Sequence, residues 1–146
     1  WDKLLLLCAT REGTGNTEKK INSLIESKGL GDRVQLVTEF LDDEVAIATL
    51  AKCELLVFPY QNTKESASGA VRMGVASGVP LAVSPIPIFD DVSGAIRMRS
   101  KSVDDIVASI SMISDDELES SRQAIVELRD SLQWDEVAKR IQERLR

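Results

Sequence analysis

Apolar and polar residues alternate along this chain in blocks that predict strands and helices in turn. Residues 3–9 form a continuous apolar run of strand length, as expected for a strand covered on both faces. Residues 17–27 instead carry apolar side chains at Ile21, Leu24 and Ile25, a helical spacing that ends at Gly29. The same alternation then predicts strands at residues 33–40, 53–58, 81–84 and 95–98, and helices at 44–52, 68–77, 102–113, 115–130 and 134–145.

This regular order of strand and helix indicates the fold class. Strands joined through helices form right-handed βαβ units, which build a parallel sheet with helices on both faces. We therefore expect an α/β, Rossmann-like fold with a parallel sheet of about five or six strands. The chain has 146 residues, enough for one domain with a proper core, so residues 1–146 are expected to form a single domain.

Composition is typical of a soluble globular protein. Hydrophobic residues make up 43% and charged residues 29%, and no apolar run approaches the roughly 20 residues of a membrane span. We expect a cytoplasmic protein, with association of the full protein with the inner face of the membrane left open. The chain begins at Trp1 rather than Met, as expected of a fragment of a longer protein.

Charge and residue types exclude several functions. A formal net charge of −6 argues against sequence-independent nucleic-acid binding, which depends on neutralising phosphates. The absence of histidine removes the Ser-His-Asp triad and most zinc sites, and no metal is expected. Cys8 and Cys53 both lie in apolar runs, which indicates small core residues in a reducing compartment.

The most informative stretch is the polar segment from Pro59 to Arg72. It follows the apolar run at residues 53–58 and precedes residues 73–84, where Gly78-Val79-Pro80 leads into another expected strand. This layout places a polar loop at the carboxyl end of a strand and at the N-terminus of a helix that opens on small residues. Both locations suit an anionic ligand.

A second loop, from Gly13 to Glu18, lies between the first expected strand and the first expected helix. Its glycines let the backbone close around a phosphate, and Thr14 and Thr17 offer hydroxyl donors. The run Thr14-Gly15-Asn16-Thr17-Glu18 resembles the phosphate loop of flavodoxins, which implies an FMN-binding electron carrier as one alternative. Aromatic residues make up only 4% of the chain, which disfavours a flavin because its ring needs flat apolar partners.

From Arg33 onward the chain resembles the donor-binding, C-terminal half of a GT-B glycosyltransferase of the large retaining family 4. The matching positions, in chain order, are Val57-Phe58-Pro59, Glu65, Ser68-Gly69, Gly78-Val79-Pro80 and the strand at 81–84. Residues 32–36 and the run Trp134 to Arg140 also fit, so the resemblance spans roughly three quarters of the chain. The Glu-Ser-Ala-Ser-Gly-Ala-Val-Arg variant looks like a subgroup of bacterial polysaccharide-building enzymes.

The resemblance implies a nucleotide-diphospho-sugar as the donor and a metal-independent transferase. Glu65 is then the catalytic residue, which accepts hydrogen bonds from hydroxyls of the donor sugar, while the helix start meets the diphosphate. The expected donor-binding residues are Arg11, Gly13, Gly15, Lys19, Ser66, Ala67, Ser68, Gly69 and Arg72. Because parallel strands end at one edge of a sheet, both loops are expected to line one cleft.

The family's second acid is absent, because Met73 occupies its position eight residues after Glu65. A non-catalytic domain of the same fold that has lost donor binding therefore remains a further alternative. The acceptor site of such transferases lies in an N-terminal Rossmann domain that is not in this chain. We expect the chain alone to bind donor weakly or not at all and to have no transferase activity.

Overall fold

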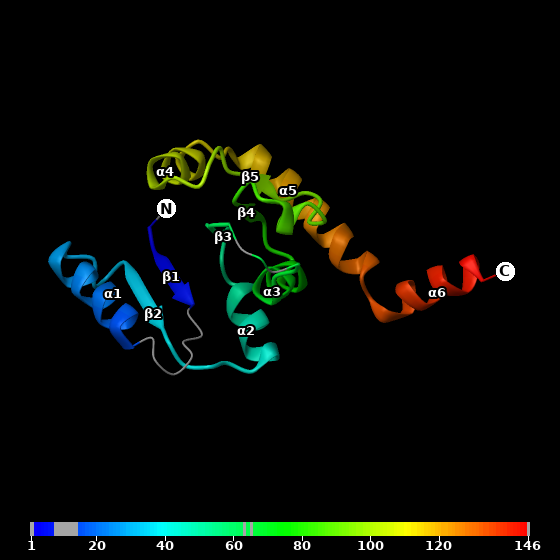
Figure 1. Ribbon diagram of the computed structural model, residues 1–146, viewed down its shortest axis with the longest axis horizontal. Helices are drawn as coiled ribbons and strands as arrows, with labels where there is room; N and C mark the ends of the chain where they lie inside the picture. The colour runs from blue at the N-terminus through cyan, green and yellow to red at the C-terminus, as the bar shows by residue number, and fades with distance from the viewer. Residues whose placement is uncertain (1, 8–14, 63, 65, 146) are drawn as a thin grey trace. The chain divides into compact units, whose positions relative to one another are not determined.

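The computed structural model describes residues 2–7, 15–62, 64 and 66–145, which form short strands in alternation with helices (Figure 1). The strands are β1 (Leu4–Leu7), β2 (Val34–Val37), β3 (Leu56–Phe58), β4 (Leu81–Val83) and β5 (Ile96–Arg97). The helices are α1 (Gly15–Ser27), α2 (Asp43–Leu50), α3 (Gly69–Ser77), α4 (Val103–Ser111), α5 (Asp115–Ser131) and α6 (Trp134–Arg144), with a 3₁₀ helix η1 (Pro87–Phe89). The chain divides into two compact units, residues 1–42 and 43–146.

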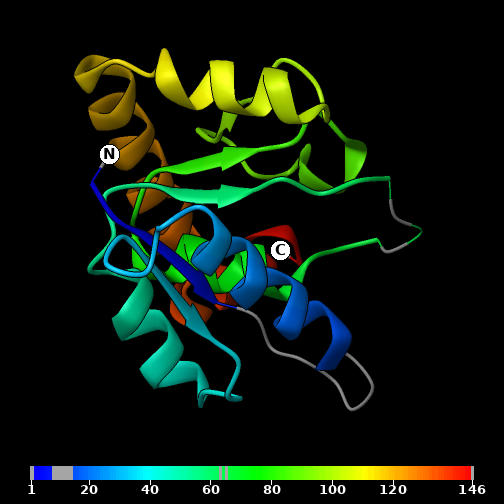
Figure 2. The same cartoon turned by 90° about the vertical axis from the view of Figure 1, so that its left-hand side faces the viewer.

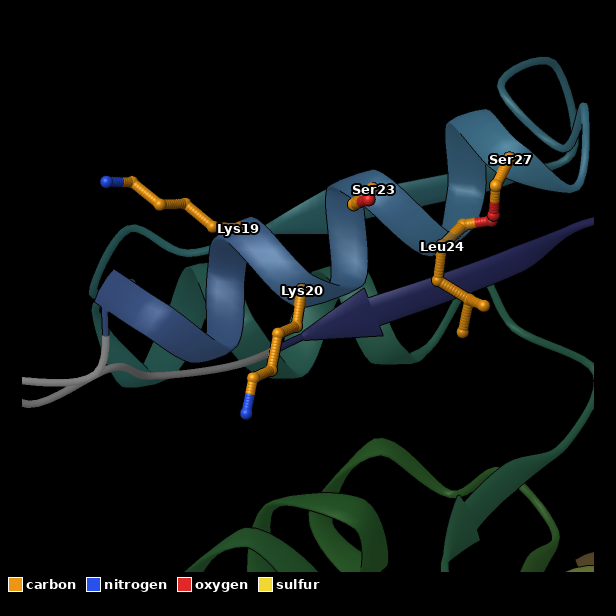
Figure 3. A pocket seen from close by; sticks show the side chains of 5 residues that line it. All are labelled: Lys19, Lys20, Ser23, Leu24 and Ser27. Carbon is orange, nitrogen blue, oxygen red and sulfur yellow. The ribbon is translucent and has the colours of Figure 1, made fainter.

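In the first unit, β1 and β2 pair in parallel, from Leu4 opposite Val34 to Leu7 opposite Val37. Helix α1 joins the two strands and runs alongside them (Figures 1 and 3). The chain leaves α1 through Gly29, whose φ of 62° lies in the left-handed region that glycine tolerates and other residues avoid. The backbone N–H of Leu30 then bonds the carbonyl of Ile25, which satisfies an acceptor at the helix end.

In the second unit, β4 lies at the centre of a parallel sheet with the order β3-β4-β5. Figure 2 shows β3 and β4 side by side and pointing the same way. All three residues of β4 are buried, which explains why its sequence is apolar without alternation. The buried side chains of this core come from Leu56, Val71, Val75, Val79, Leu81, Val83, Ile86, Phe89, Val92 and Ile125.

Helix α3 packs closely on the β3–β4 pair because of Gly74. A Cβ at this position would lie 3.0 Å from Leu81 Cδ2 and 3.1 Å from Phe58 Cζ. The helix ends at Gly78, which has a φ of 72° and donates its backbone N–H to the carbonyl of Val75. Only Val79 and Pro80 separate this cap from the start of β4.

Helices α4 and α5 begin with side-chain caps, whereas the N-cap of α6, Gln133, makes no side-chain capping bond. Ser102 caps α4, and Ser114 forms a capping box with Glu117 at the start of α5. Helix α5 holds the loop before β5 through Ser121, whose hydroxyl donates to the carbonyl of Gly94 at 2.7 Å. Within the described part of the chain, no helix is both long and apolar enough to cross a membrane.

The structure confirms the α/β, Rossmann-like class, with parallel pairing of every described strand. It differs from the expectation in one respect, because the five described strands form two sheets of two and three strands rather than one sheet. The described strands are only two to four residues long, so each hydrogen-bonded ladder is short. Cys53 is half-buried, and burial raises the pKa of its thiol, in keeping with a packing role.

Candidate functional site

The polar loop after β3 begins at the carboxyl edge of the three-stranded sheet, as the sequence predicts. The carbonyl of Phe58, the last residue of β3, accepts a 3.2 Å bond from the backbone N–H of Ser84, the first residue beyond β4. The backbone N–H of Met98, just beyond β5, bonds the carbonyl of Val83. The ends of all three strands therefore meet at one edge, where ligands of open α/β sheets bind.

Ser68 is the N-cap of α3. Its backbone is extended, with φ −111° and ψ 117°, and its hydroxyl accepts from the backbone N–H of Val71 at 3.4 Å. The side chain is buried, whereas the neighbouring Gly69 faces open space: a Cβ there would meet nothing within 4 Å. A helix start with this opening offers backbone N–H groups and the positive end of the helix dipole to an anion.

An aromatic side chain holds this cap in place. Tyr60 Oη lies 3.1 Å from Ser68 Oγ, and its ring makes edge contacts with Phe89 at 5.3 Å and Phe58 at 6.3 Å between centroids. Since Phe89 belongs to η1, these contacts connect the loop after β3 with the segment after β4. The sequence gives no sign of the bond between Tyr60 and Ser68, which are eight positions apart.

Two arginines at this edge pair with two adjacent aspartates. Arg72, one turn into α3, forms an ion pair with Asp91, and the side chains are 38% and 60% exposed. Arg97 at the end of β5 lies 3.9 Å from Asp90 and donates a 2.6 Å hydrogen bond to the carbonyl of Phe89. The sequence does not reveal these pairs, because their partners come from different segments of the fold.

The loop after β5 is tied to the loop after β3. Lys101 Nζ donates to Asn62 Oδ1 at 2.8 Å, and Gln61 Nε2 donates to the carbonyl of Lys101 at 3.1 Å. Beside them, hydrogen bonds from Ser100 and Ser102 hold the pKa of Asp105 below its usual range, with a smaller contribution from Arg99. The carboxyl edge is therefore a set of loops that are bonded to one another.

The structure brings some of the expected donor-binding residues together. Ser66 and Ala67 are exposed just before α3, and Ser68, Gly69 and Arg72 occupy its first turn. Gly15 begins α1, and Lys19 is exposed on the same helix in the first unit. Arg11, Gly13 and Glu65 lie outside the described residues. Of the flavodoxin-like loop, Gly13 and Thr14 lie outside them, and residues 15–18 form the start of α1. A single cleft lined by both loops stays a prediction.

Helix α1 carries a shallow, open hollow of about 340 Å³ (Figure 3). Its lining comes entirely from this helix: Lys19, Lys20, Ser23, Leu24 and Ser27. The side chains of Lys19 and Lys20 point away from each other, so they do not converge on one ligand (Figure 3). We therefore assign no site to this hollow.

Comparison with known proteins bears on the fold. No family model matches the chain, and no curated protein matches its sequence. Among solved structures, sucrose-phosphate synthase from Thermosynechococcus elongatus superposes with a TM-score of 0.69 at 18% sequence identity. The match covers 97% of this chain and 37% of that enzyme. The chain therefore shares the fold of part of that synthase.

Proposed function

We propose that this chain is the donor-binding half of a retaining glycosyltransferase whose donor is a nucleotide-diphospho-sugar. The observation that carries the proposal is the match of 97% of the chain to sucrose-phosphate synthase, an enzyme named for making sucrose phosphate. Independent support comes from the order of motifs between Val57 and Ser84, which resembles family 4 of these enzymes. The variant around Ser66 further suggests bacterial polysaccharide or glycoconjugate synthesis as the setting.

The start of α3 supplies the chemistry that a diphosphate needs. A departing nucleoside diphosphate gains negative charge as the glycosidic bond breaks, and backbone N–H groups at a helix N-terminus stabilise that charge without a metal. Gly69 leaves room for phosphate oxygens to approach the backbone. Arg72, one turn further, brings a guanidinium whose flat array of donors fits phosphate oxygens.

The remaining roles follow from the family resemblance. Glu65 would accept hydrogen bonds from the donor sugar, and Arg11, Gly13, Gly15 and Lys19 would approach the diphosphate from the first loop. The match covers only 37% of the solved transferase, so the acceptor site is proposed to lie in another part of a longer protein. On this view the chain alone has no transferase activity, but it binds the donor weakly.

Binding measurements on the 146-residue chain test the proposal. We would titrate a panel of UDP-, GDP- and TDP-sugars by ligand-observed NMR and by calorimetry, which together cover weak affinities. Arg72→Ala and Glu65→Ala should lower the affinity for the preferred donor at least tenfold. Arg122→Ala is the matched control, since Arg122 is a partly exposed arginine on α5 that pairs with Glu119. Equal binding by wild type and all three variants would refute the site.

Absence of binding to every donor would favour a non-catalytic domain of the same fold. A yellow preparation with flavin absorbance would instead support the FMN alternative. Detectable sugar transfer by this chain alone would contradict the division into two halves. Each of these results is distinct from the loss expected in the Arg72 and Glu65 variants.

A further inference from the structure

The guanidinium of Arg72 is already occupied by a carboxylate of the same protein. Arg72 lies in the first turn of α3, and Asp91 lies two residues beyond η1, so their ion pair bridges two loops at the carboxyl edge of the sheet. Both side chains are partly exposed, so the pair is open to solvent and to ligands. The carboxylate takes the place that an anionic ligand of Arg72 would need.

The neighbouring pair provides a comparison. Arg97 lies 3.9 Å from Asp90, and its guanidinium also donates to the carbonyl of Phe89 at 2.6 Å. This backbone bond fixes Arg97 independently of the Asp90 carboxylate. Asp90 and Asp91 are therefore adjacent acids in different settings. Asp91 pairs with the arginine at the start of α3, whereas the arginine beside Asp90 also has a backbone partner.

We propose that Asp91 is an internal competitor for Arg72, which occupies the guanidinium until a diphosphate displaces it. The inference rests on the proposed function, because it assumes that the anion binds at the start of α3. An exposed carboxylate–guanidinium pair is weak and opens at little cost. A diphosphate brings more charge and also meets the helix dipole and the backbone N–H groups near Gly69, so it outcompetes a single carboxylate.

The effect of this competition on ligand affinity can be estimated. When only a fraction of the protein has a free Arg72, the apparent affinity for the anion falls in proportion to that fraction. For an exposed pair of ordinary strength, removing Asp91 should raise the affinity up to about sixfold. The gain should shrink as salt screens both the ion pair and the ligand.

Asp91→Asn and Asp90→Asn, each in the 146-residue chain, test this competition because they change the net charge equally at adjacent positions. Affinities for inorganic pyrophosphate and for UDP-glucose would be measured from amide shifts of residues 68–72 in ¹⁵N spectra. We expect Asp91→Asn to bind both probes several-fold more tightly than wild type, with Asp90→Asn within twofold of wild type. Circular dichroism would establish that both variants are folded.

The Arg72 Nε–H signal offers a second readout. In wild type the chemical shift of this signal should change when pyrophosphate is added, because phosphate replaces the carboxylate of Asp91. In Asp91→Asn without ligand, the signal should already have a different chemical shift, because the carboxylate is absent. Equal affinities in the two variants, or weaker binding by Asp91→Asn, would overturn the competition while leaving donor binding in place. Lack of any shift with pyrophosphate and UDP-glucose in wild type and Asp91→Asn would overturn both this inference and the proposed function.

Discussion

Tyr60 Oη and Ser68 Oγ lie 3.1 Å apart and close the loop that joins β3 to α3. The two residues are eight positions apart, and the bond holds the entry and exit of the loop together. Tyr60 is itself fixed by edge contacts with Phe58 and Phe89. The start of α3 is thus anchored by a side chain that lies two residues beyond β3, which preorganises the candidate site.

Tyr60→Phe should remove this anchor with little change in packing. The variant keeps the ring contacts and loses one hydrogen bond to a buried hydroxyl, so the free energy of unfolding should fall by about 1 kcal/mol. Urea denaturation measures this loss. Ser68→Ala also removes the N-cap and should cost about 0.5–2 kcal/mol. If the double variant loses the full sum of the two single losses, the two groups do not interact and the anchor is refuted.

Gly69→Ala should weaken ligand binding while leaving the stability of the fold nearly unchanged. The added Cβ meets no atom within 4 Å and alanine favours a helix, so stability should stay within about 1 kcal/mol of wild type. Donor binding should weaken at least tenfold, because the methyl group occupies the space that phosphate oxygens need. Gly31→Ala is the matched control, since Gly31 is also open and lies in the first unit. Unchanged donor affinity in Gly69→Ala would move the diphosphate away from this helix start.

Two glycines with positive φ should differ in their tolerance of alanine. At Gly78 a Cβ meets the mobile end of Arg129 at 2.9 Å, so Gly78→Ala should cost only the left-handed backbone strain, about 1–2 kcal/mol. At Gly94 a Cβ would lie 2.3 Å from Ala124 Cβ on α5. Gly94→Ala should therefore cost about 3 kcal/mol or more, because overpacking adds to the strain. Equal losses in thermal unfolding would mean that α5 does not pack against Gly94.

The capping box of α5 should make stability depend on acid pH. Hydrogen bonds from the backbone N–H and hydroxyl of Ser114 hold the pKa of Glu117 below its usual range. The folded state therefore favours the ionised carboxylate, and this stabilisation is complete above the unfolded pKa of about 4.3. This stabilisation should disappear as the pH falls from about 4.3 through the lower pKa that Glu117 has in the folded protein. At pH 7 the free energy of unfolding of Glu117→Gln should be lower than that of wild type, and in acid the two values should converge. Urea denaturation at several pH values measures both.

Glu127→Gln serves as the control for this titration, since Glu127 is exposed on the same helix. It removes the same charge at an exposed position without touching the cap, so a loss of stability seen only in Glu117→Gln belongs to the cap. A difference for Glu117→Gln that is constant from neutral to acid pH would contradict a role for the ionised cap.

Much of the fold can be predicted from the sequence because its signals are local. The apolar run at 81–84 predicts β4, and Ser68 followed by small residues predicts the start of α3. Gly78, placed directly after the apolar helix positions, predicts its end. These features depend on residues that are neighbours along the chain, so their pattern carries the information. The η1 turn at Pro87–Phe89 lacks such a pattern and is seen only in the structure.

The sequence by itself determined the α/β class, the order of elements and the helix start that is the candidate anion site. Only the tertiary structure decided the partners of its side chains: Asp91 for Arg72, Tyr60 for Ser68 and Lys101 for Asn62. It also decided the grouping of the described strands into two sheets. The physical reason is that each of these relationships joins residues from different loops. Which loops lie next to each other depends on how the parallel strands pair, and the local pattern of residue types does not give that pairing.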